Sequence, residues 1–258
     1  MREFVKIERV SQTVVWTVDR ASARNALDAA TVSELEAALA AAEADASLRA
    51  VVLTGGGEST FISGADLKLL SSGQTALRAE VDARVLALTQ GLEQLPVPVF
   101  AALNGQVLGG GCEVALACDM RIAEPHSSVT FKHASLSVTP GWGGLVRLTR
   151  TVPPGIAAKL FFSAQPIDAE EARRVGLFDE VVAKGESRAR ALALAAEVEK
   201  NSPSAVADLK RLLRLGYAGA LDQAEETRVF LARTESADHL EALAAFREKR
   251  RPKFGPLG

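Results

Sequence analysis

One stretch of the chain places glycines and a carboxylate in an order suited to carbonyl chemistry. An apolar run, 97–103, ends at Asn104-Gly105, and three consecutive glycines, 109–111, precede an alanine-rich segment with the pattern of a helix. Glycine leaves backbone N–H groups open to a ligand because it has no Cβ, and the helix dipole adds partial positive charge there. Glu113 lies one turn inside this helix. The stretch predicts a place to hold a developing oxyanion beside a general base.

A second glycine loop, Ser63-Gly64-Ala65-Asp66, also follows an apolar segment. If both loops face one pocket, one N–H from each can hydrogen-bond a single carbonyl oxygen, an arrangement worth about 10²–10³ in rate per donor. Two ordinary tight turns are the alternative at this point. A nucleotide-binding loop is disfavoured, because the chain has neither a GxGxxG motif nor a glycine loop ending in Gly-Lys-Ser/Thr.

The elements that must position these loops have an α/β pattern. Apolar alternation over 5–18 predicts a hairpin, 50–54 a buried strand, 81–95 a long helix and 177–182 a further strand. Asp28, Asp168 and Ser202 are suited to helix N-caps, the last before an N1 proline. The helix after Ser202 is expected to have an apolar face formed by Val206, Leu209 and Leu213. Strands alternating with helices favour parallel pairing. We predict an α/β core over residues 1–195 and a helical C-terminal region over residues 196–258.

Length, composition and charge limit the class of protein and the partners that the chain could have. The chain has 258 residues, 48% apolar and 24% charged, with a net charge of −2, so it resembles an ordinary globular protein and gives no indication of nucleic-acid binding. No apolar run approaches the ~18 residues of a membrane span, and Met1 leads directly into strand-like sequence without a signal peptide. We therefore predict a cytoplasmic protein. Cys112 and Cys118 are expected to be buried, and no metal-ligand spacing is present.

Several motifs together resemble the crotonase (enoyl-CoA hydratase/isomerase) superfamily. They occur in order over nearly the whole chain, at 24–27, 61–67, 104–113, 140–148 and 246–250. The resemblance implies a crotonase-type spiral of ββα units with a helical C-terminal trimerisation region, assembled as a trimer or a hexamer. It also implies an acyl-CoA thioester substrate and no separate cofactor, because coenzyme A is part of the substrate. The reaction stays open, since this fold hosts hydratases, isomerases, decarboxylases and hydrolases.

The resemblance also assigns site residues. By matching motifs, the N–H groups of Ala65 and Gly110 would form the oxyanion hole, and Glu113 would be one of the two catalytic glutamates of the hydratases. The other matched positions would contact coenzyme A: Ala26, Ser63 and Asp66 in the same subunit, and Phe246 and Lys249 from the tail of a neighbouring one.

The chain departs from the hydratase pattern at the second glutamate. Counting back seven residues from Pro140 gives His133, whereas anchoring on Phe131 with a short deletion gives Ser135. Neither is an acid. This leaves three possibilities. In the first, Glu113 acts alone as base and acid, with His133 or Ser135 holding the water. Alternatively His133 replaces the missing acid, since an imidazole with its ordinary pKa of about 6.5 suits proton transfer. The third possibility is that the reaction is not hydration.

We predict a hydro-lyase that interconverts a 2-enoyl-CoA and its 3-hydroxyacyl-CoA. Lys132-His133 would place cationic or polar groups near the acyl chain, which suggests a carboxylated acyl group such as that of 3-methylglutaconyl-CoA. Segments 131–133 and 141–144 also look like the ethylmalonyl-CoA decarboxylase branch, so decarboxylation of a methylmalonyl- or ethylmalonyl-type CoA is an alternative. A catalytically silent protein that binds an acyl-CoA is the alternative from another class.

Overall fold

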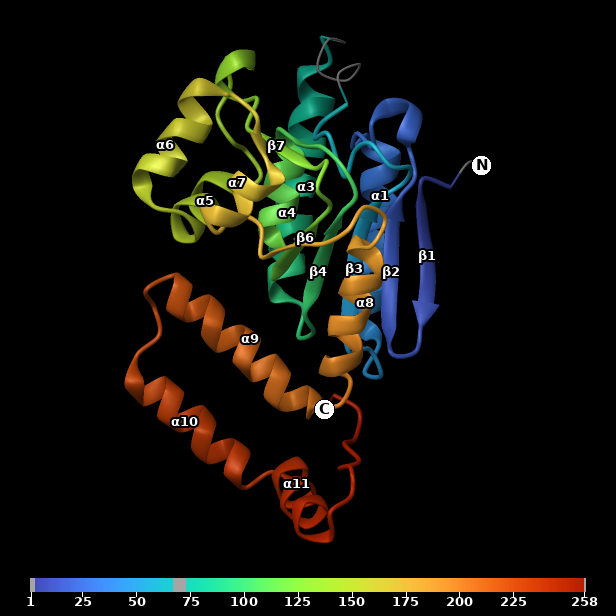
Figure 1. Ribbon diagram of the computed structural model, residues 1–258, viewed down its shortest axis with the longest axis vertical. Helices are drawn as coiled ribbons and strands as arrows, with labels where there is room; N and C mark the ends of the chain where they lie inside the picture. The colour runs from blue at the N-terminus through green and yellow to red at the C-terminus, as the bar shows by residue number, and fades with distance from the viewer. Residues whose placement is uncertain (1–2, 67–72, 258) are drawn as a thin grey trace.

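The structure, a computed structural model, describes residues 3–66 and 73–257 (Figure 1). Residue 67, the end of the second loop motif, lies outside the described residues. A large sheet forms the centre, with antiparallel pairing between its first two strands and parallel pairing between all the others. Its strands, in spatial order, are β1 (Val5–Val10), β2 (Thr13–Val18), β3 (Ala50–Gly55), β4 (Val99–Leu103), β6 (Met120–Ala123) and β9 (Glu180–Val181).

Both faces of the large sheet are covered by helices. Val51 and Leu53 of β3 pack in one apolar cluster with α1 (Ala29–Ala44) and α3 (Thr75–Gln94), whereas Val52 packs in the other with α8 (Ser187–Val198). Alternate side chains of a strand point to opposite faces, and a strand buried on both sides must be apolar throughout. This explains the continuous apolar run that predicted β3. The predicted hairpin and long helix are also confirmed.

A smaller sheet is formed by a later part of the chain. It consists of β5 (Val107–Leu108), β7 (Ser128–Thr130) and β8 (Ile167–Asp168). The helices in this part of the chain are α4 (Gly110–Ala117), η2 (Ala134–Leu136), α5 (Gly144–Thr151), α6 (Pro154–Ser163) and α7 (Ala169–Arg174), whereas the short helix η1 (Ala21–Ala23) follows β2. Isolated parallel bridges, Leu27 with Ala65 and Thr60 with Gln106, join loops that are distant in sequence.

The predicted N-caps are confirmed. Asp28, Asp168 and Ser202 each accept a hydrogen bond from the backbone N–H three residues later, at 2.9, 2.8 and 3.2 Å. The strand expected over 177–182 is shorter than predicted, because β9 contains only 180–181. The first two backbone N–H groups of the predicted strand, at Leu177 and Phe178, instead donate to Ala172 O at the end of α7.

Three helices form the C-terminal tail: α9 (Pro203–Tyr217), α10 (Gln223–Thr234) and α11 (Ala237–Glu248). They lie at one end of the molecule, beyond the large sheet (Figure 1). The predicted boundary at 195/196 falls inside α8, whose Ala195 is buried against the sheet. The division into two units stays a prediction. Within the described ranges, no helix is long and apolar enough to cross a bilayer, and the cytoplasmic location also stays a prediction.

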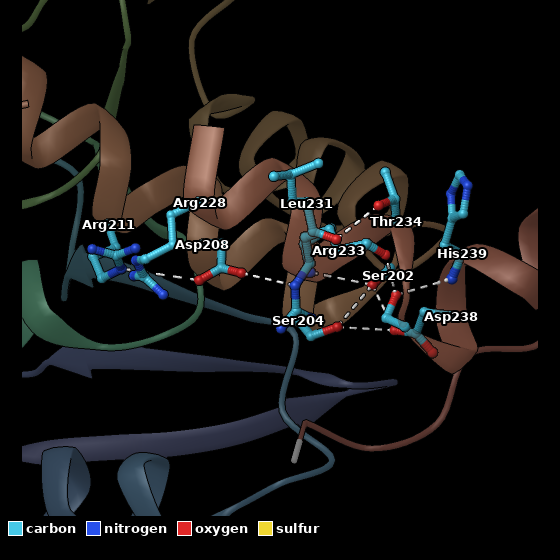
Figure 2. Close-up of polar contacts among 12 residues, drawn as sticks. Ser202, Ser204, Asp208, Arg211, Arg228, Leu231, Arg233, Thr234, Asp238 and His239 are labelled. Carbon is cyan, nitrogen blue, oxygen red and sulfur yellow. Dashed lines mark hydrogen bonds and ion pairs between the residues drawn. The ribbon is translucent and has the colours of Figure 1, made fainter. Parts of the chain in front are cut away.

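Polar contacts fix the three tail helices to one another (Figure 2). The Ser202 and Ser204 hydroxyls both donate to Asp238 Oδ2, at 2.6 and 3.0 Å, and so tie the start of α9 to α11. Arg233 of α10 pairs with Asp208 of α9 at 3.0 Å. The apolar face predicted for α9 is not covered within the chain, since Leu209 and Leu213 are 58% and 54% exposed.

Candidate active site

A cavity of about 830 Å³ opens where the loops after β2, β3 and β7 meet the start of α4. Two segments, one containing Ala65 and the other Gly110 and Glu113, are about fifty residues apart in sequence and meet here because the strands that precede them, β3 and β4, lie side by side in the sheet. Most of the predicted site residues line this cavity: Ala26, Ser63, Ala65, Asp66, Gly110, Glu113 and His133.

Three predicted site residues do not line the cavity. Ser135 lies exposed in η2, where its hydroxyl donates to Lys132 O at 2.8 Å. Phe246, near the end of α11, is 84% exposed, and Lys249 is the residue that ends this helix. The structure therefore brings His133, and not Ser135, next to Glu113. The roles of the two tail residues depend on a neighbouring subunit and stay predictions.

The N–H of Ala65 is left available by the way its loop is held. Leu27 N donates to Gly64 O at 2.8 Å, and Asp66 N donates to Leu27 O at 3.1 Å. This parallel bridge uses the groups on either side of Ala65 and leaves its own amide unpaired among the described residues. The amide of Gly110, at the first position of α4, is likewise without a partner in the described part of the chain.

Glycine allows the two loops to touch backbone to backbone. Gly64 has a φ of +93°, and a Cβ there would lie 2.7 Å from Gly110 N. A Cβ at Gly111 would lie 1.9 Å from Ile62 O. No other residue fits such an approach without moving the backbone. Two unpaired N–H groups, from Ala65 and Gly110, therefore belong to adjacent loops of one cavity, as an oxyanion hole requires.

Glu113 is a buried carboxylate with well-defined partners. It is 2% exposed. Its Oε2 accepts hydrogen bonds from the backbone N–H groups of Trp142, at 2.8 Å, and Gly144, at 2.7 Å. Its Oε1 lies 3.1 Å from His133 Nε2. These donors compensate the desolvation of the charge. Since both backbone donors use Oε2, Oε1 is the oxygen with capacity for proton transfer.

His133 is buried between Glu113 and two aromatic rings. Its ring centroid lies 6.4 Å from that of Phe131 and 5.7 Å from that of Phe161. Nδ1 is buried and has no hydrogen-bond partner among the described residues. An imidazolium would bury an unpaired N–H at Nδ1, whereas the neutral Nε2–H tautomer leaves only an unpaired acceptor there. The hydrogen-bond pattern thus favours a neutral His133 that donates to Glu113.

Trp142 closes the cavity over the start of α4. A Cβ at Gly110 would lie 2.1 Å from the indole ring, so the ring packs directly on this glycine. The indole N–H donates to Asp82 Oδ1 of α3 at 3.0 Å. Sequence reasoning missed Asp82, because its position on a long helix carries no local signal. Only the packing of α3 against α4 brings it to the site.

Comparison with known proteins decides the family. Residues 8–256 match the enoyl-CoA hydratase/isomerase family. The chain belongs to this family. It is 36% identical to the short-chain-enoyl-CoA hydratase of Clostridium acetobutylicum, over 96% of this chain and 95% of the relative. It is 33% identical to the 2,3-dehydroadipyl-CoA hydratase of Escherichia coli, over 96% and 97%. The crystal structure of an enoyl-CoA hydratase from Bacillus anthracis superposes with a TM-score of 0.93 at 33% identity, covering 98% and 99% of the two chains. The predicted crotonase fold is therefore confirmed.

This member of the enoyl-CoA hydratase/isomerase family lines its cavity with several cations. Arg20, in the loop after β2, pairs with Asp66 at 3.0 Å and Asp28 at 2.9 Å. Among the described residues, Arg24, Arg78 and Lys132 are the other cations that line it. Of these, sequence reasoning singled out Lys132. It missed Arg78, which lies on α3 near Asp82.

The two cysteines have a structural environment, as predicted. Both are buried. Burial raises the pKa of Cys118 to about 12 and that of Cys112 well above its ordinary range. Cys112 therefore stays a thiol, although it precedes Glu113 in the sequence. Within the described residues, no group of three or more His, Cys, Asp or Glu side chains could hold a metal ion.

Proposed function

We propose that this chain hydrates a 2-enoyl-CoA thioester to the 3-hydroxyacyl-CoA. The observation that carries the proposal is the arrangement of Glu113 and two unpaired amides, of Ala65 and Gly110, around one cavity. A thioester's α-carbon accepts charge only when its carbonyl oxygen is stabilised, which the two amides would do. Family membership and the hydratases among the relatives support the same reaction.

The chemistry balances with one carboxylate. Water adds its oxygen to C3 of the enoyl group while Glu113 Oε1 removes a proton from that water. The electron pair of the C2=C3 bond moves onto the thioester oxygen, where the N–H groups of Ala65 and Gly110 stabilise the enolate. Glu113 then returns the proton to C2. Carbonyl and carboxylate are recovered unchanged, and no further acid is required.

His133 orients the carboxylate in this scheme. Its Nε2–H is used by Glu113, and its Nδ1 is buried, so neither nitrogen is directed at a water in the cavity. Among the alternatives open from the sequence, the geometry favours Glu113 as both base and acid. His133 fixes Oε1 in place, and the hydroxyl of Ser135 is occupied by Lys132 O.

For the acyl group, we propose a substrate with a carboxylate. Lys132 is exposed, lines the cavity and has no carboxylate partner in the described part of the chain. Lys132 directly precedes His133 in the sequence, whereas the arginines that line the cavity come from the loop after β2 and from α3. Because His133 is hydrogen-bonded to Glu113, we assign the substrate carboxylate to Lys132. The dehydroadipyl-CoA of the E. coli relative's name is a compound of this kind.

One panel of thioesters tests both proposals. The protein is incubated with crotonyl-, 3-methylglutaconyl-, 2,3-dehydroadipyl- and methylmalonyl-CoA while enoyl absorbance and CO₂ release are followed. Loss of absorbance without gas supports hydration. Gas release would support decarboxylation, and no change with any thioester would support a silent binder. Equal kcat/KM for crotonyl-CoA and the carboxylated thioesters would contradict the role of Lys132, and Lys132→Met should lower kcat/KM only for the latter.

We also propose that the tail mediates self-association. Apolar side chains of all three tail helices are exposed, among them Leu213 of α9, Phe230 of α10 and Leu240 of α11. Exposed apolar surface of this extent is typical of an interface. The polar contacts of Figure 2 hold the three helices in one arrangement and leave these side chains free for a second copy. Phe246 and Lys249 would then extend toward the coenzyme of that copy.

A further inference from the structure

We propose that Arg147 is a positioning residue for the proton transfer at Glu113, held in place by Glu93. This inference rests on the proposed function, since Glu113 is the group that it positions. Arg147 is buried in α5 and contacts neither Glu113 nor the cavity. It acts through the peptide of Trp142.

Both backbone polar groups of Trp142 are hydrogen-bonded, although they belong to successive peptide planes. Its N–H donates to Glu113 Oε2 at 2.8 Å. Its carbonyl oxygen accepts two hydrogen bonds, from Arg147 Nη1 at 2.6 Å and from the Thr89 hydroxyl at 3.0 Å. This oxygen belongs to the Trp142–Gly143 peptide, a rigid plane that lies between the two peptides whose N–H groups, of Trp142 and Gly144, donate to Glu113 Oε2. By fixing this middle plane, Arg147 limits how far the two neighbouring peptides can rotate away from the carboxylate.

Glu93 completes the arrangement from the opposite side. Its Oε2 lies 2.7 Å from Arg147 Nη2, and its own helix α3 also carries Thr89. A guanidinium presents parallel donors in a fixed plane, so one group can hold a carbonyl and a carboxylate together. Among the described residues, the buried guanidinium has one carboxylate partner, and its Nε has no hydrogen-bond partner. The guanidinium therefore has little freedom to turn away from Trp142.

Close packing leaves no room for another residue in this turn. Gly143 has a φ of +87°, and a Cβ there would lie 2.7 Å from Arg147 Nη1. A Cβ at Gly144 would lie 2.3 Å from Glu113 Cγ. The turn between Trp142 and α5 is thus packed between the guanidinium and the catalytic carboxylate. Loss of the guanidinium would let the turn relax and move Oε2, and a shift of 1 Å can cost about 10²-fold in rate.

The test compares Arg147→Met, Glu93→Leu and Glu93→Gln with the control Arg150→Met. Arg150 lies on the same helix, is exposed, and does not line the active-site cavity. Glutamine at 93 keeps an acceptor for Nη2, whereas leucine does not. Each variant is assayed for kcat, KM and thermal midpoint with the enoyl-CoA that the wild-type protein hydrates best. Glu93 is partly exposed, so its variants keep the test possible if Arg147→Met does not fold.

We expect Arg147→Met to lower kcat about 10- to 100-fold and Glu93→Leu about tenfold. KM should change less than threefold, because the oxyanion hole and the coenzyme side of the cavity are untouched. Glu93→Gln should stay within threefold of wild type, and Arg150→Met should match it. A kcat within threefold of wild type in both Arg147→Met and Glu93→Leu would overturn the inference, as would an equal loss in Glu93→Gln.

Tryptophan fluorescence supplies a readout that a purely stabilising role would not move. Trp142 should shift its emission to longer wavelength in Arg147→Met and Glu93→Leu but not in Arg150→Met. Trp16, the other tryptophan, is buried in β2 and contributes equally to all variants. A lower thermal midpoint without an emission change would overturn the inference. If the wild-type protein hydrates no enoyl-CoA, the proposed function fails, and the emission alone decides whether Arg147 positions Trp142.

Discussion

Glu113 Oε1 and His133 Nε2 lie 3.1 Å apart, and both buried residues line the cavity. The carboxylate has two further donors on its other oxygen, whereas the other nitrogen of the imidazole has no partner in the described part of the chain. This asymmetry favours His133 Nε2 as the donor and Glu113 Oε1 as the acceptor of their hydrogen bond. The following predictions begin from that assignment.

Glu113→Gln should lower kcat for hydration by about 10²–10⁴-fold, the usual contribution of a positioned base. Glutamine has nearly the same shape, so the cavity and the coenzyme contacts should persist. The measurement is steady-state hydration together with binding of coenzyme A by calorimetry. A variant with wild-type kcat would contradict the role of Glu113, and a loss of coenzyme A binding would show that the substitution disturbs more than the base.

His133→Phe should lower kcat about 10- to 100-fold, because a hydrogen bond to a charged group contributes about 1.5–3 kcal/mol. The ring would still pack with Phe131 and Phe161 but would leave Glu113 Oε1 without its donor. His133→Gln, which keeps an N–H donor, should retain more activity than His133→Phe. Equal rates in the two variants would show that the donor is not what His133 contributes.

Gly64→Ala should lower kcat at least tenfold, because the added Cβ would lie 2.7 Å from Gly110 N and the backbone has a φ of +93°. The two loops would separate, and with them the two amides on the thioester oxygen. Gly155→Ala is the matched control, since a Cβ there meets nothing within 4 Å. Rates are compared at saturating substrate. An active Gly64→Ala variant would contradict the proposed oxyanion hole.

Leu213→Lys should weaken self-association, because Leu213 is 54% exposed on α9 beside other apolar side chains of the tail. A lysine in an apolar interface loses hydration without gaining a partner. Ile7→Lys makes the same change on β1, where Ile7 is 51% exposed and remote in sequence from the tail. Sedimentation velocity gives the mass of each variant. A monomeric wild-type protein would refute the proposed assembly.

The tail should lose stability in acid. The Arg250 side-chain hydrogen bond lowers the pKa of Glu241 to about 2, and those from Arg228 and Arg211 lower the pKa of Glu225 to about 2. Because these folded-state pKa values lie below the ordinary 4.5, the unfolded chain binds more protons in acid. The stabilisation is present above about pH 4.5 and is lost as the pH falls toward 2.

The measurement for this prediction is the thermal midpoint between pH 5 and pH 3, with Glu241→Gln as the comparison variant. Both carboxylates are partly exposed, so the difference should be small and should shrink further in high salt. Parallel pH curves for the variant and the wild-type protein would contradict the contribution of Glu241.

Local sequence signals were sufficient for most elements of the fold. The N-caps at Asp28, Asp168 and Ser202 depend on a side chain that bonds an amide three residues later, which is a purely local interaction. The strand over 177–182 was the exception. The first two backbone N–H groups of this segment donate to a carbonyl at the end of α7, so they are not available for hydrogen bonds to a neighbouring strand.

The sequence by itself determined the two glycine loops, the single carboxylate Glu113 and the absence of a second glutamate. These are matters of residue type and spacing, and the motifs that carry the family resemblance are continuous in sequence. His133 and Ser135 were equal candidates at that level, because an alignment with a short deletion accommodates either one.

Only the tertiary structure decided between them. The loop after β7 turns His133 inward to Glu113 and Ser135 outward to Lys132 O. The structure alone also joined Glu93, Arg147 and Trp142, which come from two helices and a turn. Such contacts depend on how α3 packs beside α4 and α5, and the separation of these residues along the chain contains no information about that packing. The apolar face of α9 is a further example. The residue pattern predicts that this face is buried, but it does not identify the surface that covers it.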